Sequence, residues 1–385
     1  MNFRRVLFFL ILPLLAIGVL PALAQPQQPA VPCYWRPSSL DKPWIGPDIP
    51  CLEEVTPAGM DGELAFTSLA AAPDGTLYAA RPLAGEVWAL TDGDGDGLPE
   101  MPRLLAGGLT RPNGLAWYDE ALFVAGGPHI YRLTSGGVVT VLVDDLPAGP
   151  GYWTGGIAVG ALDGAETRIY VGTGAACDTC ETGDTGRGAV WSFALDGSDG
   201  RIEATGLRQP ADLAMFDGAL WVVDSAPAST FSQPGLDEIN RVTPGADFGF
   251  PRCLGAATGE CTGVTTPHIQ LPTGSTPLGI AAYASDVVPA FNRTLLVALA
   301  GSTGQVELRG YTLAQAVPET GEVNVLMPQT TGQPGFDTTD ELNYRTVGFY
   351  PERPYDVAVS PLGWVYISLS NGRILAIRPQ SEIVY

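Results

Sequence analysis

Positive charge is scarce in this sequence. Twenty Lys and Arg residues, with Lys42 the single lysine, stand against 41 Asp and Glu, so the formal net charge is −21. Proteins that bind nucleic acids need clustered cations along the phosphate backbone, and the arginines here are scattered. The composition argues against nucleic acid as a partner. We interpret the acidity as a source of solubility for an exported protein, with some carboxylates available to divalent cations.

Long apolar runs are also few, and only one has the flanks of a targeting signal. Arg4 and Arg5 precede an apolar run over residues 6–19, and the small residues of Ala22-Leu-Ala24 follow it. This pattern predicts a secretory signal peptide over residues 1–24, cleaved after Ala24. The alternative is a retained anchor, but the run is shorter than the ~20 apolar residues of a spanning helix. We expect a secreted or periplasmic protein with no membrane span in the mature chain.

Cysteine is limited to six residues, and an oxidising compartment makes disulfides their default state. Six cysteines allow fifteen connectivities, and we expect the local one, because each close pair flanks Gly, Pro or acidic loop residues. A metal or redox role for the C-x-x-C pair is the alternative, but no second such pair, nearby His or βαβ pattern accompanies it. The expected disulfides are Cys33–Cys51, Cys177–Cys180 and Cys253–Cys261.

Uninterrupted stretches of helical length are missing from the rest of the chain. The sequence holds 48 Gly and 34 Pro, and the segments between them are rich in Val, Ile, Leu, Tyr and Trp. This mixture is typical of many short strands joined by turns. The composition therefore predicts an all-β fold.

Six copies of one hairpin pattern follow residue 63. In each copy a strand with a central Ala meets a Gly-containing or acidic turn, and a strand with an aromatic residue or Leu returns beside it. The copies start roughly 40 to 80 residues apart, as four-stranded blades with variable outer loops do. They occupy residues 67–78, 113–123, 155–170, 211–221, 278–296 and 355–366.

This recurrence predicts a six-bladed β-propeller over residues 63–385. A β-sandwich would explain the hairpins but not the repetition of the same hairpin. Residues 25–62, with frequent Pro, are interpreted as an N-terminal strap that packs against the propeller. We expect the ring to be closed by this strap or by the C-terminal strands.

Residues just before each repeat are the candidates for function, because the loops that enter the innermost strands converge at one mouth of the central channel. Arginines before the second, fourth and sixth copies predict a positive pocket. The alternative is that these arginines begin strands and stack between blades. The candidates are Arg111, Asn113, Tyr152, Thr154, Arg208, Gln209, Asp212, Thr276, Arg353 and Asp356.

Two segments resemble the glucose and sorbosone dehydrogenase family. TGLRQPADLA (205–214) resembles the family's GLRNP motif, and DEINRVTPGADFGFP (237–251) its DEIN…PGxxYGWP hallmark. TDGDGDG (91–97), VGTGAACDTC (171–180), PLGI (277–280) and RPYDVA (353–358) are similar to the sorbosone dehydrogenase branch. The resemblance covers about residues 66–377. It implies a six-bladed propeller, export, calcium, and oxidation of a sugar, aldose or polyol by pyrroloquinoline quinone (PQQ).

The resemblance also implies which residues hold the cofactors. Arg208 matches the Arg of GLRNP and Gln209 replaces its Asn, so we expect both to bind the quinone. The same role is expected of Asp212, Arg353 and Asp356. The family's calcium loop, which uses mainly backbone oxygens, corresponds here to residues 224–237, so the implied calcium residues are Asp224, Ala226, Pro227 and Asp237.

The family's catalytic base is where this sequence departs from the pattern. The family has His in a GH-x-T-R context, and here Tyr152 replaces the His and Gly155 the Arg. Tyr has an ordinary pKa near 10, which makes it a poor base at neutral pH. His129 and His268 match no family position and are interpreted as structural. We expect dehydrogenase activity to be low, and Tyr152→His, alone or with Gly155→Arg, to raise it.

Two other functions compete with the quinoprotein dehydrogenase. One is a non-catalytic propeller that binds a ligand or partner in an inherited pocket. The other is a calcium-dependent lactonase, suggested by RPNGLA (111–116), which resembles a metal-binding strand of that propeller family. A lactonase would carry a further metal carboxylate near Ser68, where none stands, and the DEIN segment is foreign to it.

A second calcium candidate is the acidic turn of Asp92, Asp94 and Asp96, with Glu100 beyond it. Alternating carboxylates on a Gly-rich turn can place oxygen ligands around calcium. The turn is not an EF-hand, because the twelfth position of such a loop is Arg103. The alternative is an acidic hairpin turn that binds no ion.

Overall fold

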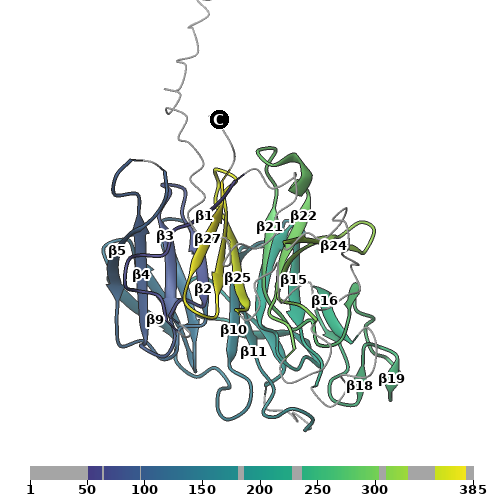
Figure 1. The fold of residues 1–385 in the computed structure, drawn as a ribbon. Coiled ribbons are helices and arrows are strands. Elements are labelled where there is room, and N and C mark those ends of the chain that lie inside the picture. Colours follow the sequence, from purple (N-terminus) through teal and green to yellow (C-terminus); the bar gives the residue numbers. More distant parts are fainter. Residues whose placement is uncertain are drawn as a thin grey trace, which may run out of the picture.

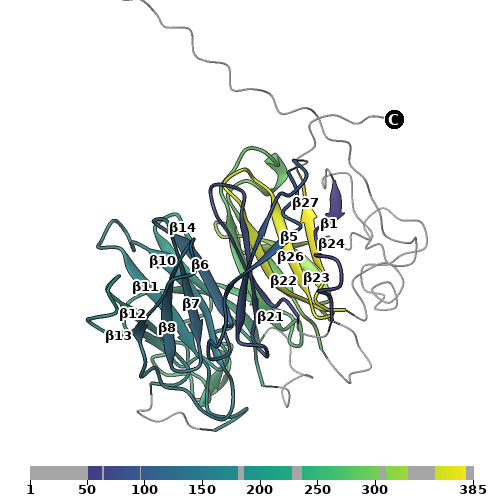
Figure 2. The ribbon, with the colours of Figure 1, turned by 90° about the vertical axis from the view of Figure 1, so that its left-hand side faces the viewer.

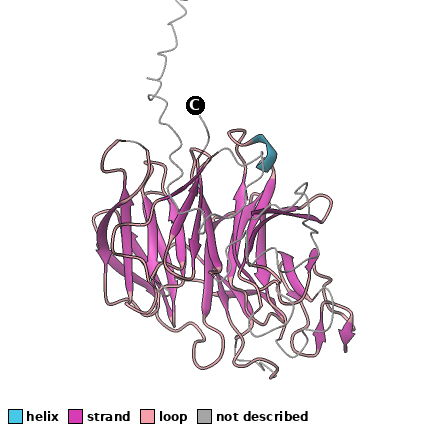
Figure 3. Ribbon diagram, viewed as in Figure 1, coloured by secondary structure: helices cyan, strands magenta, loops and turns pink. Residues whose placement is uncertain are grey.

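Strands make up almost all of the regular structure (Figure 3). The computed structural model describes residues 51–62, 65–95, 97–180, 186–227, 236–302, 309–327 and 352–378. Within these ranges the only helix is a 3-10 turn at Pro289–Phe291. The strands form six blades arranged as a β-propeller (Figure 1), which confirms the predicted all-β, six-bladed fold.

The first three blades follow the chain order, each starting with its innermost strand. Blade 1 contains β2 (Ser68–Ala71), β3 (Leu77–Arg81), β4 (Glu86–Thr91) and β5 (Met101–Ala106). Blade 2 contains β6 (Gly114–Tyr118), β7 (Ala121–Gly126), β8 (His129–Thr134) and β9 (Val139–Val143). Blade 3 contains β10 (Thr154–Gly160), β11 (Arg168–Thr173), β12 (Ala189–Phe193) and β13 (Arg201–Thr205), with β17 (Ala246–Asp247) added in parallel.

The last three blades repeat this order. Blade 4 contains β14 (Asp212–Phe216), β15 (Ala219–Asp224), β16 (Asp237–Val242) and β20 (Ile269–Leu271). Blade 5 contains β21 (Pro277–Tyr283), β22 (Thr294–Leu299), β23 (Thr312–Val317) and β24 (Glu322–Met327). Blade 6 contains β25 (Pro354–Val359), β26 (Val365–Leu369), β27 (Ile374–Ile377) and β1 (Leu52–Glu54). A separate hairpin pairs β18 (Cys253–Leu254) with β19 (Thr258–Gly259).

The hydrophobic core is divided among the interfaces between blades. Six clusters of buried side chains are present in the described residues, and each joins two neighbouring blades. Between blades 2 and 3, for example, Phe123 packs in one cluster with Ile157 and Ile169. The inner strands β2, β6, β10, β14, β21 and β25 contact one another in that cyclic order around the axis. Because each blade buries its faces against its neighbours, the first residues of the inner strands are the ones that face the central axis.

The ring closes in blade 6, where both parts of the chain expected to close it meet. β1 pairs antiparallel with β27, with Leu52 opposite Ile377, and forms the outermost strand of the blade. Figure 2 shows the purple β1 beside the yellow β27. A buried ion pair of 2.8 Å joins Glu53 to Arg378, and Glu54 pairs with Arg373 at 2.9 Å. Part of the segment interpreted as a strap thus contributes a strand to the last blade.

Two of the expected disulfides, Cys177–Cys180 and Cys253–Cys261, are confirmed. Cys33 lies outside the described residues, so its pairing with Cys51 stays a prediction, as does the signal peptide over residues 1–24. The part of the chain that the structure describes contains no helix long and apolar enough to cross a membrane.

Candidate functional site

The mouth of the propeller is the end at which the six inner strands begin. Between blades 3 and 4 the loop before β10 packs directly on the loop that follows β11. Gly151 has a φ of +102°, and a Cβ there would lie 2.2 Å from the carbonyl oxygen of Ala176. Only glycine fits this crossing without a backbone shift. The crossing brings Tyr152 over Gly174, where a Cβ would lie 2.4 Å from the Tyr152 Cβ.

Backbone hydrogen bonds and one buried arginine hold these loops together. The Tyr152 amide donates to Ala175 O at 2.9 Å, and the Ala175 amide donates to Arg208 O at 2.7 Å. The Arg187 guanidinium is buried beneath them and donates to the carbonyl oxygens of Tyr152 (2.8 Å) and Ala175 (3.0 Å), among others. Burial lowers the pKa of Arg187, although an arginine remains protonated at any physiological pH. Arg187 therefore fixes the loop that carries Tyr152 and the loop after β11.

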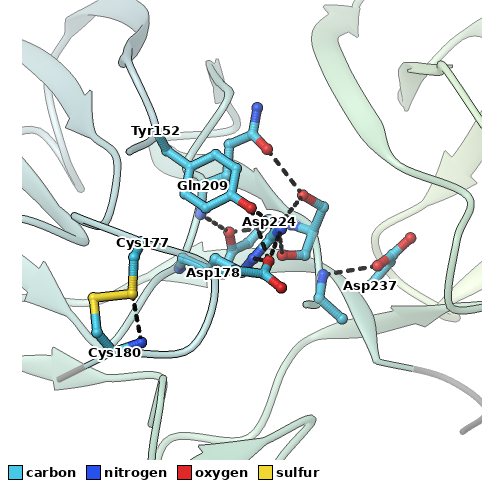
Figure 4. Close-up of polar contacts among 10 residues, drawn as sticks. Tyr152, Cys177, Asp178, Cys180, Gln209, Asp224 and Asp237 are labelled. Atoms are coloured by element: carbon cyan, nitrogen blue, oxygen red, sulfur yellow. Dashed lines mark hydrogen bonds and ion pairs between the residues drawn. A yellow bond between two sulfur atoms is a disulfide. The ribbon is translucent and has the colours of Figure 1, made fainter. Parts of the chain in front are cut away.

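Figure 4 shows the polar contacts around Tyr152, Asp178, Gln209 and Asp224. Arg208 donates most of the side-chain hydrogen bonds of this network. Its side chain is 8% exposed. Nε donates to Asp178 Oδ1 at 2.9 Å, and Nη1 donates to Ser225 O at 2.9 Å and Ser225 Oγ at 3.1 Å. Nη2 donates to the Tyr152 hydroxyl and to Asp178 Oδ1, while the guanidinium lies over the Tyr152 ring at 4.1 Å. Every N–H of the guanidinium thus has an acceptor within the protein.

The Tyr152 phenol stays protonated in this setting. Its hydroxyl donates to Asp178 Oδ1 at 2.8 Å and accepts from Arg208. Burial raises the pKa of Tyr152 to about 12, since the opposing effect of the Arg208 charge is smaller and the Asp178 carboxylate adds to the rise. The sequence-based expectation that this residue is a poor base at neutral pH fits this environment.

Asp224 and Asp237, expected to be calcium residues, hold the surrounding loops. Asp224 accepts backbone amides from Arg208 (2.9 Å) and Gln209 (2.6 Å), and Asp237 accepts those of Ala226 (2.8 Å) and Thr276 (2.8 Å). Burial raises the pKa of Asp237 to about 6 and also raises that of Asp224. Both carboxylates therefore orient the backbone of residues 224–227, in which Ser225 O already accepts from Arg208.

Gln209 provides the clearest sign of a missing partner. Its Oε1 accepts from Ser225 Oγ at 3.3 Å. Its Nε2 is buried and has no hydrogen-bond partner within the described part of the chain. A buried amide without an acceptor costs about 1–3 kcal/mol. An incoming acceptor beside Arg208 would remove this cost.

The three arginines of the expected positive pocket behave differently. Arg353 hydrogen-bonds to blade 5. It donates to Gly301 O (2.8 Å), Ser302 O (3.0 Å) and the Tyr311 hydroxyl (2.8 Å). Arg208 donates to Tyr152, Asp178 and Ser225, as described above. Arg111 is exposed, lies at the channel mouth, and makes no side-chain hydrogen bond or ion pair with any residue that the structure describes.

Asp212 and Asp356, expected to bind cofactor, both line the cavity on the propeller axis. Asp212 accepts the Ile280 amide at 2.8 Å and Asp356 accepts the Leu69 amide at 2.7 Å, so each carboxyl joins its inner strand to the next blade. The two carboxyl groups interact, and each affects the ionisation of the other. Burial, followed by the charge of Asp356, holds the pKa of Asp212 well above its ordinary value, and burial raises the pKa of Asp356 to about 6.

The acidic turn after β4 brings three carboxylates together. Asp92, Asp94 and Glu100 each place one carboxylate oxygen within 4.8 Å of the others, and Asp96 lies outside the described residues. Asp92 accepts the amides of Gly95 (2.7 Å) and Gly97 (2.8 Å). Glu100 Oε2 is buried without a hydrogen-bond partner in the described residues, and burial raises the pKa of this carboxyl.

The expectation that Gly155→Arg would help to restore activity is wrong. A Cβ at Gly155 would lie 2.1 Å from Pro210 O and 2.8 Å from Ala211 O. The inner strands of blades 3 and 4 approach too closely here for any side chain. The remaining expected residues are structural neighbours of the site: Thr154 Oγ1 donates to Gly127 O at 2.5 Å, Asn113 Nδ2 donates to Thr154 O at 3.3 Å, and the Thr276 amide donates to Asp237.

Sequence reasoning missed Asp178, Ser225 and Arg187. Asp178 and Ser225 lie inside segments that the family resemblance had already singled out, and Asp178 sits between the two cysteines of the C-x-x-C pair. Arg187, between two glycines, follows a stretch with no motif. The two histidines are in packing positions: His129 stacks on Tyr131, and His268 Nε2 lies 2.7 Å from Pro318 O.

Comparison with known proteins by sequence gives no match, because no protein-family model and no curated protein sequence matches this chain. Comparison by structure gives many matches. A carbohydrate-active enzyme of family AA12 from Trichoderma reesei is 17% identical, with a TM-score of 0.68 over 89% of this chain and 98% of that one. The holo form of the pyranose dehydrogenase PQQ domain from Coprinopsis cinerea is 13% identical, with a TM-score of 0.66 over 90% and 99%.

A bacterial enzyme shows the same likeness. The PQQ-bound aldose sugar dehydrogenase from Streptomyces coelicolor is 19% identical, with a TM-score of 0.55 over 84% of this chain and 97% of that one. At these identities the likeness establishes the fold alone, over 84–90% of this chain. The structural neighbours of this chain are thus six-bladed propellers of the PQQ-dependent sugar dehydrogenase type, as the sequence motifs predicted.

Proposed function

We propose that this chain is a PQQ-binding propeller of the sugar dehydrogenase type that oxidises a hydroxyl group of a sugar or polyol slowly, because Tyr152 occupies the position of the base. The observation that carries the proposal is the network around Arg208 at the mouth between blades 3 and 4. Support comes from the GLRQP and DEIN motifs that supply Arg208 and Asp237, and from the PQQ-containing structural neighbours.

The residues at this mouth fit a planar, multiply charged quinone. The buried Nε2 of Gln209 lacks an acceptor among the described residues, and the Ser225 hydroxyl links the Gln209 amide to the Arg208 guanidinium. The partner of Arg208 that a ligand can replace is Asp178, whose side chain is 42% exposed. A carboxylate of the cofactor in place of Asp178 would keep the charge-assisted hydrogen bonds of Arg208.

Bound PQQ supplies the two-electron acceptor for the substrate's C–H hydrogen. The protein has to hold the substrate and remove the hydroxyl proton. The Tyr152 oxygen is the group at the family's base position, and at neutral pH it already carries its proton. It can accept a second proton only as it passes its own to another acceptor, and its acceptor in the quinone-free chain, Asp178, is the group that the quinone would displace. This requirement explains why we expect slow turnover.

Reconstitution tests the proposal most simply. The full chain is loaded with PQQ and calcium and assayed with an artificial dye against a panel of sugars and alcohols. We expect dye reduction that depends on both PQQ and substrate, at a low rate. A protein that binds neither PQQ nor any sugar of the panel would contradict the proposal.

A non-catalytic binding propeller is the second candidate, and the protonated Tyr152 favours it. Such a protein would bind quinone or sugar without turnover. The two functions separate in the same assay, because a binding protein shows a quinone absorbance change and no dye reduction even at high enzyme concentration.

We also propose a calcium ion at the acidic turn of blade 1. Asp92, Asp94 and Glu100 each offer one carboxylate oxygen within 4.8 Å of the others, and Glu100 Oε2 lacks a hydrogen-bond partner in the described residues. Calcium addition is then expected to raise the thermal midpoint of the wild type and not that of Asp92→Asn.

Export completes the proposal. The N-terminal pattern of residues 1–24 predicts cleavage after Ala24, and the two local disulfides are those of a protein matured in an oxidising compartment. A mature chain beginning at Gln25 in the exported fraction would support this, and an intact N-terminus would contradict it.

A further inference from the structure

The Cys177–Cys180 disulfide lies next to the carboxylate that pairs with Arg208. It closes a ring of four residues, and Asp178 is one of the two residues inside this ring (Figure 4). The Cys180 amide donates to Cys177 Sγ at 2.9 Å across the ring. Because ring closure restricts the backbone dihedrals of the enclosed residues, the disulfide fixes the direction of the Asp178 side chain.

This direction matters because a single oxygen of Asp178 makes the contacts to both residues of the site. Asp178 Oδ1 accepts from Arg208 Nε at 2.9 Å and from the Tyr152 hydroxyl at 2.8 Å, and it also accepts from Arg208 Nη2. A ligand carboxylate that pairs with the same N–H groups of Arg208 therefore competes with Asp178. The apparent affinity for such a ligand falls with the fraction of the protein in which Asp178 holds Arg208.

The two confirmed disulfides differ in their exposure. Cys177 and Cys180 are both half-buried, whereas one cysteine of the other disulfide, Cys253, is 1% exposed. An external thiolate reduces a disulfide by attacking one of its sulfur atoms, so access to the sulfur controls the reaction. We therefore expect a dithiol in solution to reduce Cys177–Cys180 before the other disulfide.

We propose that the Cys177–Cys180 disulfide is a redox switch that holds Asp178 on Arg208, and that its reduction releases Asp178 and opens Arg208 to an anionic ligand. The reductant is an external dithiol. It gives two electrons and two protons, so that the S–S bond becomes two thiols and the dithiol becomes a disulfide. The inference rests on the proposed function where the anionic ligand is the quinone, which the oxidised chain then binds more weakly than the reduced chain.

The reduction equilibrium of the quinone-free full chain tests the switch without any ligand. If the disulfide favours the contact between Asp178 and Arg208, this contact must favour the disulfide to the same extent. We expect Arg208→Gln to raise the equilibrium constant for reduction by dithiothreitol at least tenfold, which is about 30 mV for a two-electron couple. Thiol alkylation with peptide mapping measures it, and Cys253–Cys261 in the same samples is the internal control. Tyr152→Phe removes one hydrogen bond of Asp178 and no charge, and should give a smaller shift in the same direction.

The sign of the shift separates the switch from a direct effect of charge. A cation near a cysteine stabilises its thiolate, so loss of the Arg208 charge alone would make reduction harder. An unchanged or lower equilibrium constant in Arg208→Gln would therefore overturn the switch. Arg201→Gln, at an exposed ion pair, should behave as the wild type does.

PQQ binding tests the consequence for the site. Cys177→Ser combined with Cys180→Ser mimics the reduced loop and leaves no thiol there that could react with the quinone. We expect this double variant to bind PQQ at least tenfold more tightly than the oxidised wild type. The same two substitutions should have no further effect in an Asp178→Asn background, in which Arg208 has already lost its carboxylate partner. An equal gain in both backgrounds would show a general loosening of the loop and would overturn the switch.

Failure of the switch is distinguishable from failure of the proposed function. PQQ binding with equal affinity in the oxidised wild type and the double variant removes the switch and keeps the quinone site. A raised equilibrium constant for reduction in Arg208→Gln, with no PQQ binding by any variant, keeps the switch and removes the quinone site.

Discussion

Arg208 shows how one buried cation can define both the structure and the chemistry of a site. Its guanidinium joins Tyr152 and Asp178 of blade 3 to Ser225 of blade 4. Motif matching identified Arg208. It did not show that every donor of the guanidinium already has an acceptor, because these partners come from loops about 17 to 56 residues away in sequence. Spacing along a chain does not predict such partners.

Tyr152→His is expected to raise dehydrogenase turnover by roughly 10²- to 10⁴-fold, the usual contribution of a general base. An imidazole at this position titrates near neutral pH, where it can take up the hydroxyl proton of the substrate. Steady-state dye reduction by the PQQ-loaded variant is the measurement. Tyr152→Phe is the control and should show no gain. Equal rates for all three proteins would place the base elsewhere.

The axial carboxyl pair should make stability depend on pH. The pKa of Asp212 and of Asp356 is raised in the folded protein, so the native state binds more protons than the unfolded state above about pH 4. Stability from this pair is therefore present at low pH and is lost as the pH rises through the folded pKa, about 6 for Asp356.

Asp212→Asn keeps a donor toward Asp356 and an acceptor for the Ile280 amide without the charge. We expect the variant to gain about 1–3 kcal/mol over wild type at pH 8 and little at pH 4. Urea unfolding at both pH values measures the difference. A gain that is the same at both pH values would show that the pair does not titrate as described.

At the scale of elements, the repeated hairpins could be predicted from the sequence, but the short strands outside them, β17, β18 and β19, could not. The turn residues and the alternation of apolar side chains mark the first two strands of each blade, as in β14 and β15 around the Asp217-Gly218 turn. β17, which adds two residues in parallel to blade 3, and the hairpin of β18 and β19 have no such pattern. Their pairing depends on tertiary contacts, which local sequence does not encode.

The inner strands pack so closely that glycine is required between blades 3 and 4. A Cβ at Gly156 would lie 2.0 Å from Asp212 Oδ1 and 2.4 Å from the Asp212 Cα. Gly156→Ala should therefore lower the free energy of unfolding by about 1–3 kcal/mol or more. Gly107→Ala is the matched control, because nothing lies within 4 Å of its Cβ position. Denaturant unfolding of both variants is the measurement, and equal stability would contradict the packing described.

At the scale of the whole molecule, the number of blades followed from the repeats, but the way the ring closes did not. β1 is three residues long and carries two glutamates, so its sequence gives little sign of a strand. β1 forms a strand because Glu53 pairs with Arg378 and the backbone of β1 pairs with β27 at the other end of the chain. Closure in this manner joins the first and last described strands.

Glu53→Gln should weaken ring closure much more than Glu54→Gln. Removing one partner of a buried ion pair costs about 3–5 kcal/mol, whereas a more exposed pair such as Glu54–Arg373 contributes about 0–1 kcal/mol. The two neighbouring substitutions on one strand control for each other in thermal or urea unfolding. Similar losses for both would mean that the buried pair does not secure the closure.

Equilibrium binding of PQQ to the calcium-loaded full chain tests the central claim most directly, with Arg208→Gln and, as a control, the exposed Arg201→Gln, whose partner is Asp199. We expect a saturable absorbance change at one quinone per chain, and a tenfold to hundredfold loss of affinity for Arg208→Gln, which corresponds to about 1.5–3 kcal/mol for hydrogen bonds to a charged group. Arg201→Gln should bind as wild type does. No saturable binding by the wild type, or equal affinity in all three proteins, would contradict a quinone site at Arg208.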